Sequence, residues 1–263
     1  MRLDKYISEA VGCTRSESRD IIKKGRISVV CSPSEAAVDA ADKGKGRKNT
    51  EAFSGVVKKH DAQIDEQAAA EGRILVLMDG IELKYRKFVY IMLNKPEGVV
   101  SASKDPSDRT VVDLVKDFYP RRELFPAGRL DKTSTGFVLI TDDGVFAHDI
   151  LAPKKHVSKT YTVVLDRPLT EEMVSAFRKG VTLADGTGLS PADAEPVSTD
   201  GMTVKMFLHQ GVYHQIKRMF GIFDAGVNAL HRDAIGGLEL DPSLKPGEWR
   251  ELSAEEIARI RMD

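Results

Sequence analysis

Residues 127–136 read AGRLDKTSTG, and this stretch decides how the rest of the chain is interpreted. It is polar and glycine-flanked, and it leads directly into an apolar run from 137 to 141 that predicts a strand. Loops at the ends of strands, held by a rigid sheet, are frequent positions for catalytic side chains. Asp131 is therefore a candidate catalytic residue, although a turn or helix-capping role is commoner for any single aspartate.

The sequence around this stretch alternates between strand and helix patterns. Apolar runs and alternation predict strands at 88–93, 137–141, 159–166 and 204–208, and helical spacing predicts helices at 145–151, 171–179, 213–223 and 255–261. The turn Asp142-Asp143-Gly144 is of the kind that separates such elements. Residues 86–263 are therefore predicted to form an α+β domain with a mixed but largely antiparallel sheet.

The first 85 residues predict a smaller α/β domain. Apolar spacing over 3–11 predicts a helix, and Thr14 three residues before Glu17 fits a capping box that opens a second helix. Short strand patterns follow at 27–30 and 74–78, and residues 81–83 can pair back after the Asp79-Gly80 turn.

Basic residues line one face of the second predicted helix. Arg15, Arg19 and Lys23 repeat at i, i+4 and i+8. Two interpretations stay open: a solvated helix surface, which is the usual role of such a stripe, and a ridge that contacts the phosphates of a nucleic acid.

Residues near 32–72 interrupt this small domain with a different composition. Ala, Asp, Glu, Lys, Gly and Ser dominate, and large apolar side chains are few, so we expect a mobile insertion. The basic run at 43–48 (KGKGRK) could bind RNA, but a solvated loop is the favoured interpretation.

Length and composition exclude several classes of protein. The 263 residues suit two domains, and a net charge of -1 means that nucleic-acid binding must come from local basic surfaces. Two cysteines, Cys13 and Cys31, cannot form a Cys-rich zinc site, and neither a metal-binding histidine pair nor a dinucleotide fingerprint is present. With no signal-peptide pattern or membrane-length apolar run, we expect a cytoplasmic protein that does not contact membranes.

Several separated motifs resemble those of pseudouridine synthases. Residues 128–131 (GRLD), followed by Thr135-Gly136 and by 141–144 (TDDG), are similar to the catalytic motif of that superfamily. Further agreement comes, in the same order, from 92–98 (MLNKPEG), 159–161 (KTY), 211–219 (GVYHQIKRM) and 230–238 (LHRDAIGGL). The pattern is most similar to the RsuA-type branch, which acts on bacterial small-subunit (16S) ribosomal RNA. Residues 1–30 resemble the S4-type RNA-binding domain that commonly precedes this catalytic domain.

The resemblance implies a reaction and a role for each matching residue. A uridine is flipped out of the RNA, Asp131 attacks it as the nucleophile, and the freed uracil rotates and reattaches through carbon. Tyr161 stacks on the uracil and helps to move its C5 proton, and Lys217 pairs with Asp131 and stabilises its charge. Ile216 packs against the base, and Arg129 holds the flipped backbone or fills the space that the nucleotide vacates. The reaction is an isomerisation, so neither a metal nor a redox cofactor is implied.

Other functions remain possible at this stage. A 23S ribosomal RNA enzyme would carry the same motifs, and a non-catalytic assembly factor could use the same surface to bind RNA. A hydrolase of glycosidic bonds lacks its second carboxylate, since Asp142 and Asp143 are adjacent in sequence. We expect a monomer whose partner is ribosomal RNA or a partly assembled ribosomal subunit. The sequence departs from the family pattern at Val212, where a basic or polar residue is usual, and at Phe137, where Leu is usual.

Overall fold

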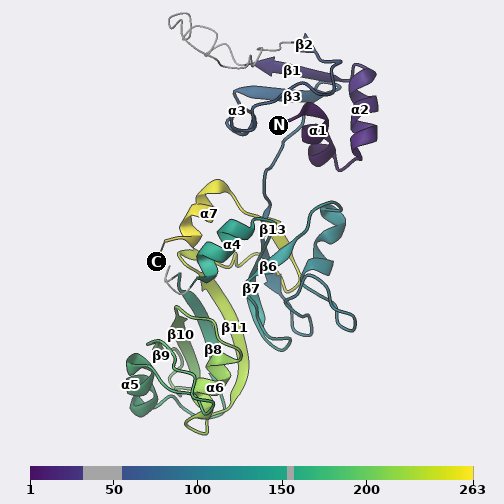
Figure 1. Ribbon diagram of the computed structural model, residues 1–263. Coiled ribbons are helices and arrows are strands. Elements are labelled where there is room, and N and C mark those ends of the chain that lie inside the picture. Colours follow the sequence, from purple (N-terminus) through teal and green to yellow (C-terminus); the bar gives the residue numbers. More distant parts are fainter. Residues whose placement is uncertain (32–54, 153–156, 263) are drawn as a thin grey trace, which may run out of the picture. The chain divides into compact units, whose positions relative to one another are not determined.

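The computed structural model describes residues 1–31, 55–152 and 157–262 (Figure 1). The chain forms two compact units. The first comprises Met1–Lys87 with Tyr119–Arg121, and the second comprises Phe88–Phe118 with Arg122–Asp263. No helix among the described residues is long and apolar enough to cross a bilayer.

The first unit is a small antiparallel sheet with three helices. It contains α1 (Leu3–Val11), α2 (Arg15–Lys23), α3 (Glu66–Ala70), β1 (Ile27–Cys31), β2 (Gly55–Val56), β3 (Ile74–Met78) and β4 (Ile81–Glu82). The sheet order is β2-β1-β3-β4, and the predicted hairpin between β3 and β4 is confirmed. The predicted capping box is also confirmed, because the Thr14 side chain accepts the Glu17 backbone N–H and the Glu17 side chain accepts that of Thr14.

The predicted mobile insertion extends too far along the chain. Residues 32–54, including the basic run at 43–48, lie outside the described residues. Residues 55–72, by contrast, supply β2 and α3, and their buried side chains Val57, Ala62 and Ile64 belong to the core of the first unit. The expectation of mobility was wrong there because a few apolar residues spaced among polar ones still reach the core.

The second unit is α+β, as the sequence predicts. Its strands are β5 (Tyr90–Lys95), β6 (Phe125–Ala127), β7 (Thr135–Thr141), β8 (Lys159–Leu165), β9 (Asp193–Pro196), β10 (Thr203–Leu208), β11 (Val227–Ile235), β12 (Leu238–Glu239) and β13 (Trp249–Glu251). Its helices are α4 (Gly144–Leu151), α5 (Glu171–Lys179), α6 (Gln215–Gly221) and α7 (Ala254–Ile260), with short 3-10 turns at Val112–Leu114 and Lys116–Phe118.

These strands join into one sheet that is built in two halves. The order is β13-β5-β7-β11-β8-β10-β9, with β6 paired to β7 and β12 paired to β11. Among strand pairs in the described residues, only β7 and β11 run parallel, through Thr135–His231 and Gly136–Arg232. Two pairs of residues therefore join the halves, and the long β11 runs beside β8 in one half (Figure 1).

Each half of the sheet has its own apolar core. In one half, Phe146 and Ile150 of α4 and Ile260 of α7 pack with Phe137 and Leu139 of β7. In the other half, α5 and α6 cover β8 and β10, and Phe177 meets Phe220 edge-on with ring centroids 5.2 Å apart. The loop between β6 and β7, residues 128–134, lies at the junction between the two halves, since β7 and β11 first pair at Thr135.

Candidate active site

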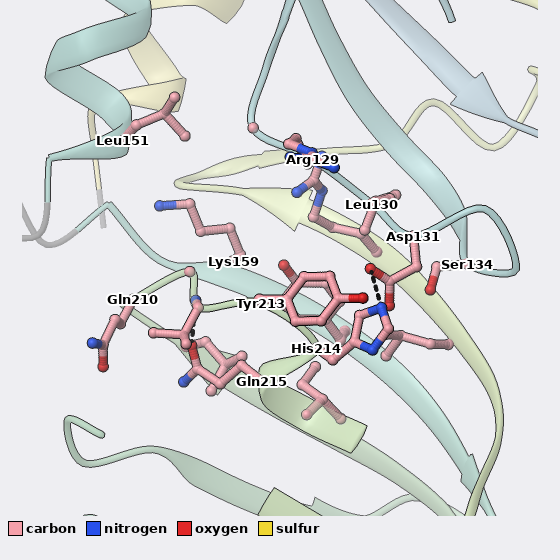
Figure 2. Close-up of a pocket in the computed structure, with 18 residues that line it drawn as sticks. Arg129, Leu130, Asp131, Ser134, Leu151, Lys159, Gln210, Tyr213, His214 and Gln215 are labelled. Carbon is pink, nitrogen blue, oxygen red and sulfur yellow. Dashed lines mark hydrogen bonds and ion pairs between the residues drawn. The ribbon is translucent and has the colours of Figure 1, made fainter. Parts of the chain in front are cut away.

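The junction loop borders a pocket with a volume of about 410 Å³. Its floor and walls come from the loop itself, from β8, from β11 and from the segment that opens α6 (Figure 2). Volumes of this size are typical of sites for small ligands or single nucleotides. The residues that line the pocket include Arg129, Asp131, Ser134, Tyr161, His214, Ile216 and Arg232.

The carboxylate of Asp131 is held between two basic side chains. His214 Nε2 lies 3.3 Å from Asp131 Oδ1, and Lys217 Nζ lies 3.6 Å from Asp131 Oδ2 (Figure 2 shows the first of these contacts). Lys217 also donates to Thr133 Oγ1 at 3.1 Å. About a quarter of the Asp131 side chain (27%) is exposed, so the carboxylate is oriented and still open to a ligand in the pocket. An oriented, accessible carboxylate is suited to act as a nucleophile or a base.

His214 reaches Asp131 through an uncommon backbone conformation. It precedes α6 with φ 50° and ψ 34°, in the left-handed region that non-glycine residues seldom adopt. Its ring stacks on the exposed ring of Tyr213, with centroids 3.9 Å apart. Backbone strain of this kind persists where the surrounding structure enforces it, and it concentrates at functional sites.

A fully buried lysine supports the loop from the interior of the second unit. Lys95, at the end of β5, donates to the carbonyl oxygens of Ser134 at 2.6 Å, Pro96 at 3.0 Å and Lys132 at 3.3 Å. Two of these bonds go to loop carbonyls that closely follow Asp131, and the third goes to the neighbouring Pro96, so Lys95 fixes the path of the loop just after the catalytic candidate. Ser101 adds a second support, because its hydroxyl donates to the Leu130 carbonyl and accepts the Leu130 N–H.

The lowered pKa of Lys95 predicts how the stability of the fold depends on pH. Burial lowers its pKa to about 8, against the opposing effect of Asp131 and Glu97, while the value in the unfolded chain is 10.5. Between these values the unfolded state binds more protons, so this group makes the native state more stable as pH rises. We expect the unfolding free energy of the wild type, minus that of Lys95→Met, to increase from about pH 8 to about pH 10.5 in urea titrations. A difference that stays flat or falls in this window would contradict the lowered pKa.

The residues predicted for substrate and catalysis come together in the second unit. Arg129 is exposed at the pocket, Tyr161 is half-buried on β8, and both line the cavity with Asp131. Ile216 is 3% exposed and belongs both to the pocket wall and to the apolar core. Lys217 contacts Asp131 as described above.

The basic stripe of α2 lies in the first unit. Arg15 and Lys23 are exposed, with no ion pair to another described residue. Arg19 differs, because its Nε lies 3.1 Å from the buried Asp4 carboxylate, which also binds Arg2 at 2.9 Å. The sequence stripe holds no carboxylate, but the fold brings one to Arg19 from α1.

Four residues of the site were missed as candidates from the sequence: Lys95, Ser134, His214 and Arg232. Each lies inside a motif quoted above, so the motifs located them without giving them roles. One signal was available, since Lys95 ends a strand that begins with an apolar run, residues 90–93. Within the described ranges, no three His, Cys, Asp or Glu side chains gather as a metal site.

Comparison with known proteins finds relatives that align with nearly the whole chain. Residues 89–221 match the model of the RNA pseudouridylate synthase family. The chain is 38% identical to an uncharacterized RNA pseudouridine synthase of Bacillus subtilis, which covers 98% of this chain and 97% of the relative. It is 38% identical to ribosomal small subunit pseudouridine synthase A of Vibrio vulnificus (99% of each chain) and 36% identical to that of Escherichia coli K12 (99% and 100%).

A solved structure shows the same fold along the whole chain. A crystal structure of a pseudouridylate synthase superposes with a TM-score of 0.62 at 32% sequence identity, and the match covers 99% of both chains. The family model includes Asp131 and the segment that carries His214 and Lys217. Together with the near-complete coverage of the relatives, these matches place the chain in the RNA pseudouridine synthase family.

Proposed function

We propose that this protein converts a specific uridine of small-subunit ribosomal RNA into pseudouridine, with Asp131 as the nucleophile. The observation that carries the proposal is the Asp131 carboxylate, oriented by His214 and Lys217 at the wall of a pocket of about 410 Å³. The choice of RNA is supported by relatives named as small-subunit enzymes, which align with 99% of the chain.

The family resemblance and the arrangement of the pocket support the following course for the reaction. A uridine in a helix hides its glycosidic bond, so the nucleotide must leave the stack and enter the cavity. Asp131 then attacks the ribose or the uracil ring, and the bond between N1 and C1′ breaks. The uracil turns within the pocket, a bond forms between C5 and C1′, and the bond to Asp131 breaks, which returns the free carboxylate. The C5 proton then leaves, and N1 takes up a proton. No atom of the nucleotide is lost, and nothing is oxidised.

Each lining residue has a place in this sequence of steps. Tyr161 offers an aromatic face on which the uracil stacks, and its hydroxyl is available to the C5 proton. Ile216 packs against the base, and the exposed Arg129 contacts the flipped backbone. Lys217 and His214 keep the Asp131 carboxylate oriented while the base moves.

The first unit would supply affinity for the RNA as an S4-type domain. This proposal rests on α2, where Arg15 and Lys23 are exposed and Arg19 keeps about two fifths of its side chain (42%) accessible beside Asp4. Phosphate contacts of this type position an RNA without reading its sequence. The substrate would be bare RNA or a partly assembled subunit, and the enzyme would act as a monomer in the cytoplasm.

Removal of these charges should weaken RNA binding without changing catalysis in the pocket. We expect Arg15→Ala and Lys23→Ala each to lower the affinity for RNA several-fold and to reduce the slope of log K against log[salt] by about 0.7–0.9. Filter binding over a series of salt concentrations measures both effects. Lys5→Ala is the matched control, because Lys5 lies on α1 and pairs with Glu9. An unchanged salt slope in both α2 variants would contradict the proposed ridge.

Tritium release from RNA labelled at uridine C5 tests the proposed function. Small-subunit and large-subunit RNAs should be offered both bare and as partly assembled particles. We expect release from small-subunit RNA, with a stoichiometry near one per molecule. Release from large-subunit RNA alone would show that large-subunit RNA is the substrate. The absence of release from every RNA would favour a non-catalytic RNA-binding factor.

A further inference from the structure

Two buried polar atoms in the described part of the chain have no hydrogen-bond partner, and both belong to residues that line the same pocket. They are Ser134 Oγ and Arg232 Nη2. Buried polar atoms in native proteins are nearly always paired, so an orphan calls for an explanation. Here both unpaired atoms belong to residues of the site where a polar ligand is expected. This indicates that the ligand supplies their hydrogen-bond partners.

Arg232 is fixed in place by the sheet. It is 3% exposed, and its Nε donates to the Phe137 carbonyl at 2.6 Å. On β11 it pairs with Tyr161 of β8, so the two side chains leave the sheet on the same side as neighbours. Arg232 is thus a cross-strand neighbour of the residue on which the base is proposed to stack.

Hydrogen bonds of its backbone groups hold Ser134 in place, and its side-chain hydroxyl makes no hydrogen bond to a described residue. Its N–H donates to the Asp131 carbonyl, and its own carbonyl accepts Lys95 Nζ at 2.6 Å. The side chain is fully buried, three residues after Asp131. A hydroxyl can donate one hydrogen bond and accept two, and none of these is used by described residues.

We infer that Arg232 and Ser134 recognise the hydrogen-bonding edge of the flipped base and select uracil over cytosine. This inference rests on the proposed function and names the groups that would read its substrate. The edge of uracil presents two carbonyl oxygens on either side of N3–H. A guanidinium can only donate, which suits a carbonyl oxygen, and the serine hydroxyl can accept N3–H.

Cytosine does not satisfy the same pair of groups. It has an amino group in place of the O4 carbonyl and a bare acceptor at N3. In the orientation that places O4 of uracil at Nη2, cytosine presents its amino group there and sets donor against donor. The ribose attached to N1 keeps the O2 carbonyl of cytosine from taking that position instead. Sites that hydrogen-bond a ligand reject an analogue lacking the matching group for this reason.

Binding of uridine 5′-monophosphate and cytidine 5′-monophosphate, measured by isothermal titration calorimetry, tests the inference. The two nucleotides share ribose and phosphate, so the ratio of their affinities isolates the base edge. We expect the wild type to prefer the uridine nucleotide by at least about tenfold. Ser134→Ala should reduce that preference about threefold or more, and Arg232→Lys should reduce it further, since a lysine lacks the planar fork.

A comparison of two buried serines, Ser101 and Ser134, distinguishes an effect on base recognition from an effect on folding. Ser101 is hydrogen-bonded to Leu130 and Ser134 Oγ has no partner, so Ser101→Ala should lower the melting temperature, while Ser134→Ala should leave it unchanged or raise it. If Arg232→Lys does not fold, Ser134→Ala alone decides the question.

The outcomes distinguish this inference from the proposed function. Equal wild-type affinities for the two nucleotides, or an unchanged preference in folded Ser134→Ala, would overturn the inference even if tritium is released from RNA. A wild type that prefers the uridine nucleotide through these residues but releases no tritium from any RNA would contradict the proposed function alone.

Discussion

Asp131→Asn is expected to abolish tritium release from C5-labelled RNA, with a loss of rate of about 10⁴-fold or more. Asparagine keeps the shape of aspartate but cannot act as an anionic nucleophile, and removal of a nucleophile accounts for losses of this order or greater in other enzymes. Single-turnover release with enzyme in excess over RNA measures the chemical step without interference from product release.

The fold and the RNA affinity of this variant should be preserved. Asp131 is partly exposed, and its contacts with His214 and Lys217 at 3.3 and 3.6 Å are of the kind that contributes at most about 1 kcal/mol to stability. Asp108→Asn is the matched control, because Asp108 pairs with the neighbouring Lys132 and is not among the residues that line the pocket. We expect Asp108→Asn to retain activity within about twofold. Comparable losses of activity in both variants would contradict the proposed role of Asp131 as the nucleophile.

Gly136→Ala is expected to destabilise the second unit by about 4 kcal/mol. A Cβ at this position would lie 2.4 Å from the Arg232 carbonyl oxygen and 2.7 Å from the Arg232 nitrogen, both of them backbone atoms. Its φ of +101° is also unfavourable for alanine. Since Gly136 is one of the two positions at which β7 pairs with β11, relief of the contact requires the two halves of the sheet to move apart.

Chemical denaturation monitored by circular dichroism measures this loss. Gly144→Ala is the matched control: Gly144 is the first residue of α4, its φ is not positive, and no atom would lie within 4 Å of an added Cβ. Alanine there should stabilise the protein slightly, by about 0.4–1 kcal/mol. Similar effects of the two substitutions would show that the close approach of β11 is not what requires Gly136.

Local features of the fold could be predicted because short-range patterns set them. The helix at 171–179 has the predicted bounds, and the helix at 3–11 begins and ends as predicted. The capping box at Thr14 depends on residues three apart, so the sequence contains all the information that it needs. The sequence likewise located the pocket loop, because its glycines and polar residues interrupt an apolar strand pattern.

The central strand could not be predicted in the same way. β11 carries register shifts between Val227 and Ala229 and between Arg232 and Ala234, so its side chains lose the two-residue alternation by which a strand is identified. It becomes a strand because β8 and β7 offer it free edges on both sides. Pairing between distant segments, rather than local preference, forms this element.

The sequence by itself determined the α+β class, most of the helices and strands, and the aspartate loop together with its family resemblance. Only the tertiary structure decided what surrounds that aspartate. Lys217 and Asp131 are far apart in the chain, and His214 reaches the carboxylate only because α6 packs against β8 and β10. Burial of Lys95 and the unpartnered atoms of Ser134 and Arg232 likewise follow from the joining of two half-sheets. A linear pattern gives residue types and spacing, whereas solvent exclusion and contact between distant segments exist only in the folded chain.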